Sequence, residues 1–195
     1  MYIYLVFSKT GTWLSRLLRL FIRFKYVHVS LSMDESLTTM YSFGRVNPDN
    51  PFSGGYVHES LYTGVYKKFR NCECIIYRLP VTEEQYRILV EELARFDAYQ
   101  DFFRYNFLGL IAAGLQVPLK RKQRYFCSQF VSELLMKINV LKSDRSPELI
   151  RPTDLLFIEG KEEVFRGYVR DYIQMMDAKG SGIPSLNFTK KGLSL

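Results

Sequence analysis

The chain has 195 residues, 47% hydrophobic and 24% charged, which is enough for one domain with a full core and excludes the disordered and low-complexity classes. No apolar run reaches the roughly 18 to 20 residues that a membrane-spanning helix needs, and the start of the chain lacks the basic segment and cleavage site of a signal peptide. The net charge of +7 is concentrated in the acid-free residues 1–33 and in a second basic cluster at residues 120–124. We therefore expect one cytoplasmic domain over residues 1–178 and a flexible tail over residues 179–195.

The two basic clusters suit a nucleic acid, an anionic lipid surface or an acidic polymer through Coulombic attraction. No zinc-finger, RNP-type or helix-turn-helix signature accompanies them, so we expect no specific nucleic-acid partner. Residues 81–101 hold six acids against two arginines, which makes the molecule dipolar. The clusters are interpreted as solvated basic faces, with peripheral contact to an anionic membrane as the alternative.

In the first part of the chain, residues 2–7 are β-branched and aromatic and predict a strand. Residues 13–24 repeat apolar side chains at helical spacing and predict an amphipathic helix. Residues 26–33 alternate between apolar and polar side chains, which predicts a strand with His28 on its polar side. Residues 38–43 predict the return strand of a hairpin.

Residues 44–58 are rich in Gly, Pro and Asn and predict a loop long enough to cover a site. After them, residues 74–79 predict a strand that Pro80 ends. Two helices with N-terminal caps are predicted next, from Thr82 to Phe96 and from Asn106 to Gln116.

The clearest helical pattern covers residues 127–138, and a mixed C-terminal region follows it, with a break at Arg151 and Pro152. Together the patterns predict an α+β fold in which a small antiparallel sheet packs against helices.

Cys127 stands at the start of the last predicted helix, on the same face as its apolar side chains. A thiol with a reference pKa near 8.5 is only about 3% ionised at pH 7, so a reactive cysteine needs groups that stabilise its thiolate. The free amides and the positive dipole end of a helix N-terminus supply one such group, and they also stabilise an oxyanion. Cys127 is therefore a candidate nucleophile.

An imidazole is the second group that such a thiol needs. His28 would take the proton from Cys127 and return it to the leaving group. A third, polar group must orient the ring, and the predicted return strand offers Ser42 or Tyr41.

Each of these residues also has a purely structural interpretation. A cysteine on an apolar helix face is usually a small buried hydrophobe, and a strand histidine is usually a hydrogen-bonded structural residue. Cys72 and Cys74 are spaced to share one face of a strand; without a second cysteine pair they predict packing, not a metal site. His58, in the predicted loop, is interpreted as a surface residue.

The motifs Y-V-H-V-S-L at His28, Y-N-F-L-G-L after Asn106 and R-Y-F-C-S-Q-F-V-S-E-L-L at Cys127, followed by R-P-T-D-L, resemble the circularly permuted papain-like cysteine hydrolases of the NlpC superfamily. The similarity is to the YiiX/YebB-like group related to lecithin:retinol acyltransferase, and it covers roughly residues 1–160. In that group the histidine precedes the cysteine, as here. The resemblance implies that Cys127 is the nucleophile, His28 the base and Asp154 a residue of fold closure.

One departure from the family pattern concerns the orienting group. Family members usually carry Glu, Gln, Asn or His on the strand after the histidine, whereas this chain offers Ser42 as the best match. A serine accepts a hydrogen bond but adds no charge, so it stabilises an imidazolium less than a carboxylate does.

The resemblance implies a cofactor-free thiol hydrolase, amidase-like or peptidase-like, that cleaves an amide or ester through an acyl-enzyme. The expected partner is a small-molecule, peptide or lipid acyl substrate, and the oligomeric state is left open. Two alternatives are a lipid acyltransferase acting at anionic membranes and a catalytically inert binding module of the same fold.

Overall fold

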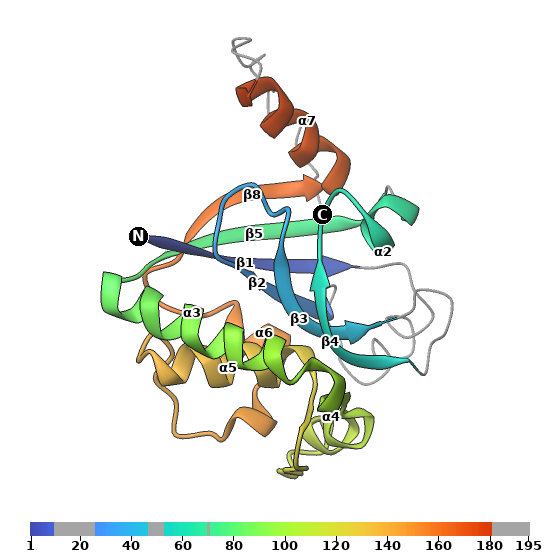
Figure 1. Ribbon diagram of the computed structural model, residues 1–195, viewed down its shortest axis with the longest axis vertical. Coiled ribbons are helices and arrows are strands. Elements are labelled where there is room, and N and C mark those ends of the chain that lie inside the picture. The colour runs from blue at the N-terminus through green and yellow to red at the C-terminus, as the bar shows by residue number, and fades with distance from the viewer. Residues whose placement is uncertain (10–25, 47–52, 70, 181–195) are drawn as a thin grey trace, which may run out of the picture.

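The computed structural model describes residues 1–9, 26–46, 53–69 and 71–180, which form a mixed α+β fold around a six-stranded sheet (Figure 1). The strands run in the order β4-β3-β2-β1-β5-β8, and neighbouring strands are antiparallel. Their bounds are β1 Tyr2–Lys9, β2 His28–Ser32, β3 Met40–Arg45, β4 Gly54–Glu59, β5 Glu73–Pro80 and β8 Glu162–Tyr168. A second, two-stranded ladder pairs β6 (Arg104–Tyr105) in parallel with β7 (Arg124–Tyr125).

Helices α3, α5 and α6 lie together below the sheet in the view of Figure 1, and α7 extends away at the opposite end of the molecule. The bounds are α2 Gly64–Lys68, α3 Glu83–Ala98, α4 Phe107–Gly114, α5 Cys127–Lys137, α6 Pro152–Leu155 and α7 Val169–Gly180, with short 3-10 turns at Gln100–Phe102 and Pro147–Leu149. Within the described residues, no helix combines the length and apolar character required to cross a membrane.

Two helices begin at the caps that the sequence predicts. The Thr82 side chain accepts a hydrogen bond from the Gln85 amide while the Gln85 side chain accepts one from the Thr82 amide, which is a complete capping box for α3. The Asn106 side chain accepts from the Gly109 amide at the start of α4. Each cap satisfies amide groups that the first helical turn leaves without partners.

The sheet separates two hydrophobic clusters because its side chains alternate between its faces. Ile3, Leu5 and Phe7 of β1 belong to the larger cluster with α3 and α5, whereas Tyr4 and Val6 belong to the smaller cluster on the other face. The polar side of β2 faces the smaller cluster and is itself buried. The sheet is therefore covered on both faces around β1 and β2.

Several sequence predictions need correction. Residues 44–58 are only partly a loop, because Gly54–Glu59 form β4 and pair with β3. Helix α7 extends to Gly180 and the Lys179 ammonium is 2.9 Å from Glu35, whereas residues 181–195 of the predicted tail lie outside the described residues. Strand β8 and helices α2 and α7 had no predicted counterpart. The helix predicted at residues 13–24 lies outside the described residues.

Candidate active site

The ring of His28 contacts a carboxylate that the sequence analysis did not select. His28 Nε2 lies 2.9 Å and 3.1 Å from the two carboxylate oxygens of Glu59. Ser30, on the same side of β2, donates a hydrogen bond of 2.5 Å to Glu59 and lies 3.3 Å from His28 Nε2. The three side chains form a hydrogen-bonded group that is largely shielded from solvent, with His28 at 14% and Glu59 at 17% side-chain exposure.

Glu59 reaches His28 across strand β3, which separates β4 from β2. The residue between them is Gly44: a Cβ atom there would lie 3.3 Å from Glu59 Oε1 and 3.7 Å from His28 Cε1. A contact of 3.3 Å is tighter than ordinary van der Waals separation. The missing side chain at Gly44 is therefore what leaves room for the carboxylate beside the ring.

The opposite charges of His28 and Glu59 shift the pKa values of both groups. Burial by itself lowers the pKa of His28, but the Glu59 carboxylate, the Cys127 thiol and hydrogen bonds to both raise that pKa well above its ordinary value. Burial likewise raises the pKa of Glu59, but the charge of His28 and hydrogen bonds from His28 and Ser30 bring the net pKa below its ordinary value. The site therefore favours an imidazolium beside a carboxylate.

Cys127 lies beside this pair. It is the first residue of α5 and is buried at 2% exposure. Helix α5 packs against β2 and β3, and the Cys127 sulfur is 4.0 Å from the carbonyl oxygen of Val27, the residue before His28. Its thiol contributes both a hydrogen bond and a Coulomb interaction to the raised pKa of His28. The first residue of α5 thus lies close to the backbone of the residue before His28, although the two are a hundred positions apart in the sequence.

Tyr105 completes the surroundings of the thiol. It ends β6 and is buried at 6% exposure. Burial, followed by the charges of Cys127 and Glu59, raises its pKa well above the usual value for tyrosine, so its hydroxyl stays protonated. Across the residues that the structure describes, this hydroxyl makes no hydrogen bond. Among the described residues, Tyr105 therefore carries a buried hydroxyl without a hydrogen-bond partner.

Close packing of β4 against β6 holds Tyr105 in place. A Cβ atom on Gly54 would lie 2.5 Å from the Tyr105 Cβ, and one on Gly55 would lie 2.9 Å from the Phe103 carbonyl oxygen. Only glycine fits at these two positions without a shift of the backbone.

Ser42 and Tyr41, the predicted orienting residues, do not contact the ring. Ser42 is fully buried and donates a hydrogen bond of 2.8 Å to the carbonyl oxygen of Val29. Tyr41 packs edge-to-face against His58 on the other side of the sheet. Glu59 lies directly after the predicted loop at residues 44–58, at the end of β4, and the sequence analysis did not select it.

The other residues singled out in the sequence have structural surroundings. His58 lies on β4, half-exposed, 2.7 Å from Asp97 of α3. Cys72 and Cys74 are free thiols buried in the smaller cluster, and burial raises the pKa of Cys72 to about 12. Asp154 lies 3.2 Å from Arg145 and 3.3 Å from Arg151, where it ties α6 to the preceding segment. Among the described residues no His, Cys, Asp or Glu cluster has the arrangement of a metal site.

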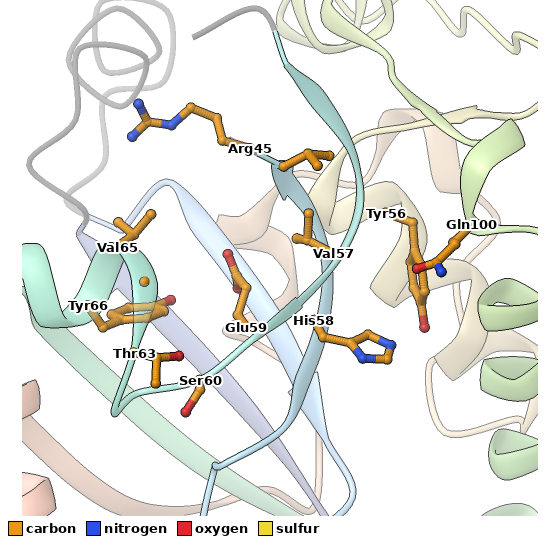
Figure 2. A pocket seen from close by; sticks show the side chains of 12 residues that line it. Arg45, Tyr56, Val57, His58, Glu59, Ser60, Thr63, Val65, Tyr66 and Gln100 are labelled. Atoms are coloured by element: carbon orange, nitrogen blue, oxygen red, sulfur yellow. The ribbon is translucent and has the colours of Figure 1, made fainter. Parts of the chain in front are cut away.

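A pocket with a volume of about 350 Å³ opens beside β4 and includes Glu59 in its wall. Figure 2 shows Glu59 and Val57 on one side of the β4 ribbon and Tyr56 and His58 on the other. Tyr66, whose pKa burial raises, also lines the pocket. The pocket gives the carboxylate side of the His28–Glu59 pair access from the surface.

Comparison with known proteins adds no assignment. No protein-family model matches the chain, and no curated protein sequence matches it.

Proposed function

We propose that this protein is a cysteine-dependent acyl hydrolase of the permuted papain-like type, with Cys127 as nucleophile, His28 as general acid and base, and Glu59 as the group that orients the ring. The observation that carries the proposal is the hydrogen-bonded pair of His28 and Glu59 beside the N-terminus of α5, where the Cys127 sulfur is 4.0 Å from the carbonyl oxygen of Val27. This is the order of groups in cysteine and serine hydrolases that use a triad.

The two nitrogens of His28 have separate tasks in this mechanism. Nε2 is held by Glu59, which leaves Nδ1 to exchange a proton with Cys127. In the reactive state the proton of the thiol is already on Nδ1, as the raised pKa of His28 favours, and the sulfur anion attacks the carbonyl carbon of an ester or amide. A C–S bond forms and the carbonyl oxygen becomes an oxyanion. The imidazolium then gives its proton to the leaving group as the C–O or C–N bond breaks.

The acyl-enzyme is resolved by the reverse sequence. His28, now neutral, takes a proton from a water molecule, and the resulting hydroxide attacks the thioester carbon. The C–S bond breaks, and the sulfur leaves with the proton from His28. Glu59 stabilises the imidazolium that forms in both steps, which a neutral serine does to a smaller extent.

The oxyanion has two sources of stabilisation. Amides in the first turn of α5 point out of the helix N-terminus, where the helix dipole is positive. The Tyr105 hydroxyl is a protonated donor with no other partner among the described residues. A donor aimed at a developing oxyanion contributes more in a water-poor site than at the surface.

Glu59 also bears on the alternative of an inert binding module. That alternative was suggested by the absence of a charged orienting residue next to His28 in the sequence. Because Glu59 supplies this charge, the observation that favoured an inert module no longer applies, and a catalytic role is the simpler proposal.

The proposal is tested by acyl transfer from p-nitrophenyl acetate and p-nitrophenyl butyrate, followed by intact-mass measurement and peptide mapping. We expect one acyl group on Cys127 and continued release of nitrophenolate. Cys127→Ala should carry no acyl group, and His28→Ala should be acylated at least a hundredfold more slowly, because it lacks the proton acceptor.

Cys72→Ala and Cys74→Ala are the matched controls, since both remove a buried thiol that faces away from α5. Their acylation rates should equal the wild-type rate, provided that circular dichroism shows a folded protein. Acylation of Cys72 or Cys74 instead of Cys127, or an unchanged rate in His28→Ala, would overturn the proposal.

A further inference from the structure

We propose that α4 and the segment after it form a docking surface for an anionic lipid bilayer. We call it the α4 surface and define it by aliphatic and basic side chains that are exposed or half-buried: Leu108, Ile111, Leu115, Val117, Leu119, Lys120, Arg121 and Lys122. Neither of the two core clusters nor the candidate active site uses these side chains.

The apolar half of the surface lies on one side of α4. Leu108, Ile111 and Leu115 follow the helical spacing of three and four residues, and they are 57%, 48% and 72% exposed. The opposite side of the helix holds Leu110 and Ala113, which are buried in the larger cluster. α4 therefore has two apolar faces, and only one of them is covered by the protein.

Backbone and side-chain hydrogen bonds fix the shape of this surface. Asn106 accepts from the Gly109 amide with its side-chain oxygen and donates to the Leu119 carbonyl oxygen with its side-chain nitrogen, at 3.0 Å and 3.3 Å. The Val117 amide donates to the Ala112 carbonyl oxygen at 2.9 Å. The segment after α4 is thus fastened back against the helix.

The basic half follows immediately in the chain. The turn at residues 121–124 is closed by a hydrogen bond of 3.2 Å from the Arg124 amide to the Arg121 carbonyl oxygen. The sequence contains no Asp or Glu from residue 102 to residue 132. Within the described part of the chain, Arg121 and Lys122 have no ion pair. Arg121 and Lys122 therefore carry positive charge without a paired carboxylate among the described residues, whereas the charge of Lys120 also acts on Glu133.

This combination fits a lipid surface better than other partners. An anionic bilayer offers acyl chains for aliphatic groups and phosphate or carboxylate headgroups for Lys and Arg, at adjacent depths. A second copy of the chain would bring two acid-free basic segments together, which like-charge repulsion disfavours. Single-stranded nucleic acid is recognised by aromatic side chains that stack on bases, whereas the apolar side chains here are aliphatic.

The α4 surface is also connected along the chain to the candidate nucleophile. β6 precedes α4 and β7 follows the basic turn; the two strands pair in parallel, and Cys127 comes two residues after β7. If the proposed function holds, on which this step rests, docking would place the bilayer on the segment that leads into the helix carrying Cys127.

The test is co-sedimentation of the full chain with vesicles of phosphatidylcholine alone and of phosphatidylcholine mixed with phosphatidylserine. We expect binding to the mixed vesicles that weakens as salt is added. The double variant Lys120→Gln/Lys122→Gln should lower the partition coefficient about thirtyfold. Leu108→Gln/Ile111→Gln should lower it at least tenfold.

Matched controls change the same kinds of side chain elsewhere. Lys67→Gln/Lys142→Gln removes two exposed ammonium groups, and Val90→Gln/Phe157→Gln replaces two exposed apolar side chains. Both controls should bind like the wild type. Equal losses in test and control variants, or no binding to mixed vesicles, would overturn the proposal, as would a dimer in sedimentation equilibrium that Leu108→Gln/Ile111→Gln dissociates.

The Cys127→Ala variant separates this inference from the proposed function, since vesicle binding does not need the thiol. Binding without acylation of Cys127 in the wild type would keep the docking surface and reject the hydrolase. Acylation of Cys127 without vesicle binding would keep the hydrolase and reject the docking surface.

Discussion

At the scale of single residues, the candidate site depends on a carboxylate that sits two strands away from its histidine. Glu59 does more than accept a hydrogen bond, because its charge holds His28 protonated in a buried position. Ser30 donates to the same carboxylate and fixes its orientation. The chemistry proposed for Cys127 therefore depends on both the geometry and the charge of Glu59.

Glu59→Gln separates these two contributions, because glutamine keeps an acceptor oxygen and loses the charge. We expect acylation of Cys127 to slow by about tenfold to thirtyfold, the difference between a charge-assisted and a neutral hydrogen bond. The pKa of His28 should fall, so the alkaline limb of the pH–rate profile should move to lower pH. The nitrophenyl ester assay measures both effects.

Ser42→Ala is the matched comparison for this prediction. It removes a buried hydroxyl from β3 that bonds to the Val29 carbonyl oxygen and not to the ring. Its pH–rate profile should coincide with that of the wild type. A shifted profile in Ser42→Ala together with an unshifted one in Glu59→Gln would show that the orienting residue has been misassigned.

At the scale of elements, strand β3 separates β2 from β4, and its residue Gly44 leaves the space between His28 and Glu59 free of a side chain. Its residues Ser42 and Gly44 share a face with His28 and Glu59, and the absence of a side chain at Gly44 lets the carboxylate cross the strand. The same principle recurs where Gly54 of β4 admits Tyr105 of β6. Glycines in strand interiors often mark such close approaches.

Substitution of Gly44 tests the need for this space directly. A Cβ at this position lies 3.3 Å from Glu59 Oε1, so Gly44→Ala should crowd the carboxylate and Gly44→Val should displace it from His28. We expect a graded loss of acylation rate, with Gly44→Val at least as slow as Glu59→Gln. Nuclear magnetic resonance titration of His28 should show a lower pKa in Gly44→Val; an unchanged pKa would contradict this role of Gly44.

At the scale of the whole molecule, the site is also a source of pH-dependent stability. The raised pKa of His28 contributes stability that is complete below its ordinary value of 6.5 and is lost as pH rises through the folded-state value. The lowered pKa of Glu59 contributes stability that is present above its ordinary value of 4.5 and is lost as pH falls through the folded-state value. The pair therefore stabilises the fold most between these two ordinary values.

Urea denaturation across this pH range checks the direction in which stability changes with pH. Between pH 4.5 and pH 6.5, the window set by the two ordinary values, Glu59→Gln should reduce the free energy of unfolding by about 2 kcal/mol, and the difference should shrink at alkaline pH. Glu84→Gln, which removes an exposed carboxylate paired with Arg87 on α3, should leave the free energy of unfolding nearly unchanged at any pH. A loss of unfolding free energy in Glu59→Gln that grows with rising pH would contradict the stabilising role of the His28–Glu59 pair.

The sequence by itself determined the features that depend on neighbouring residues. β-Branched and aromatic composition predicted β1, and alternation predicted β2 with β3 as its return strand. The cap residues Thr82 and Asn106 predicted the starts of α3 and α4, and helical spacing placed Cys127 at the head of α5. These signals are local, since they depend on backbone geometry within one or two turns.

The tertiary structure decided which distant side chains share the site. Glu59 follows the glycine-rich stretch at residues 44–58, and only the antiparallel register of β4 with β3 turned its side chain toward His28. Tyr105 came near Cys127 through the parallel pairing of β6 with β7. Strand register is set by long-range pairing and packing on both faces of the sheet, and neither quantity is encoded in the spacing of residues along the chain.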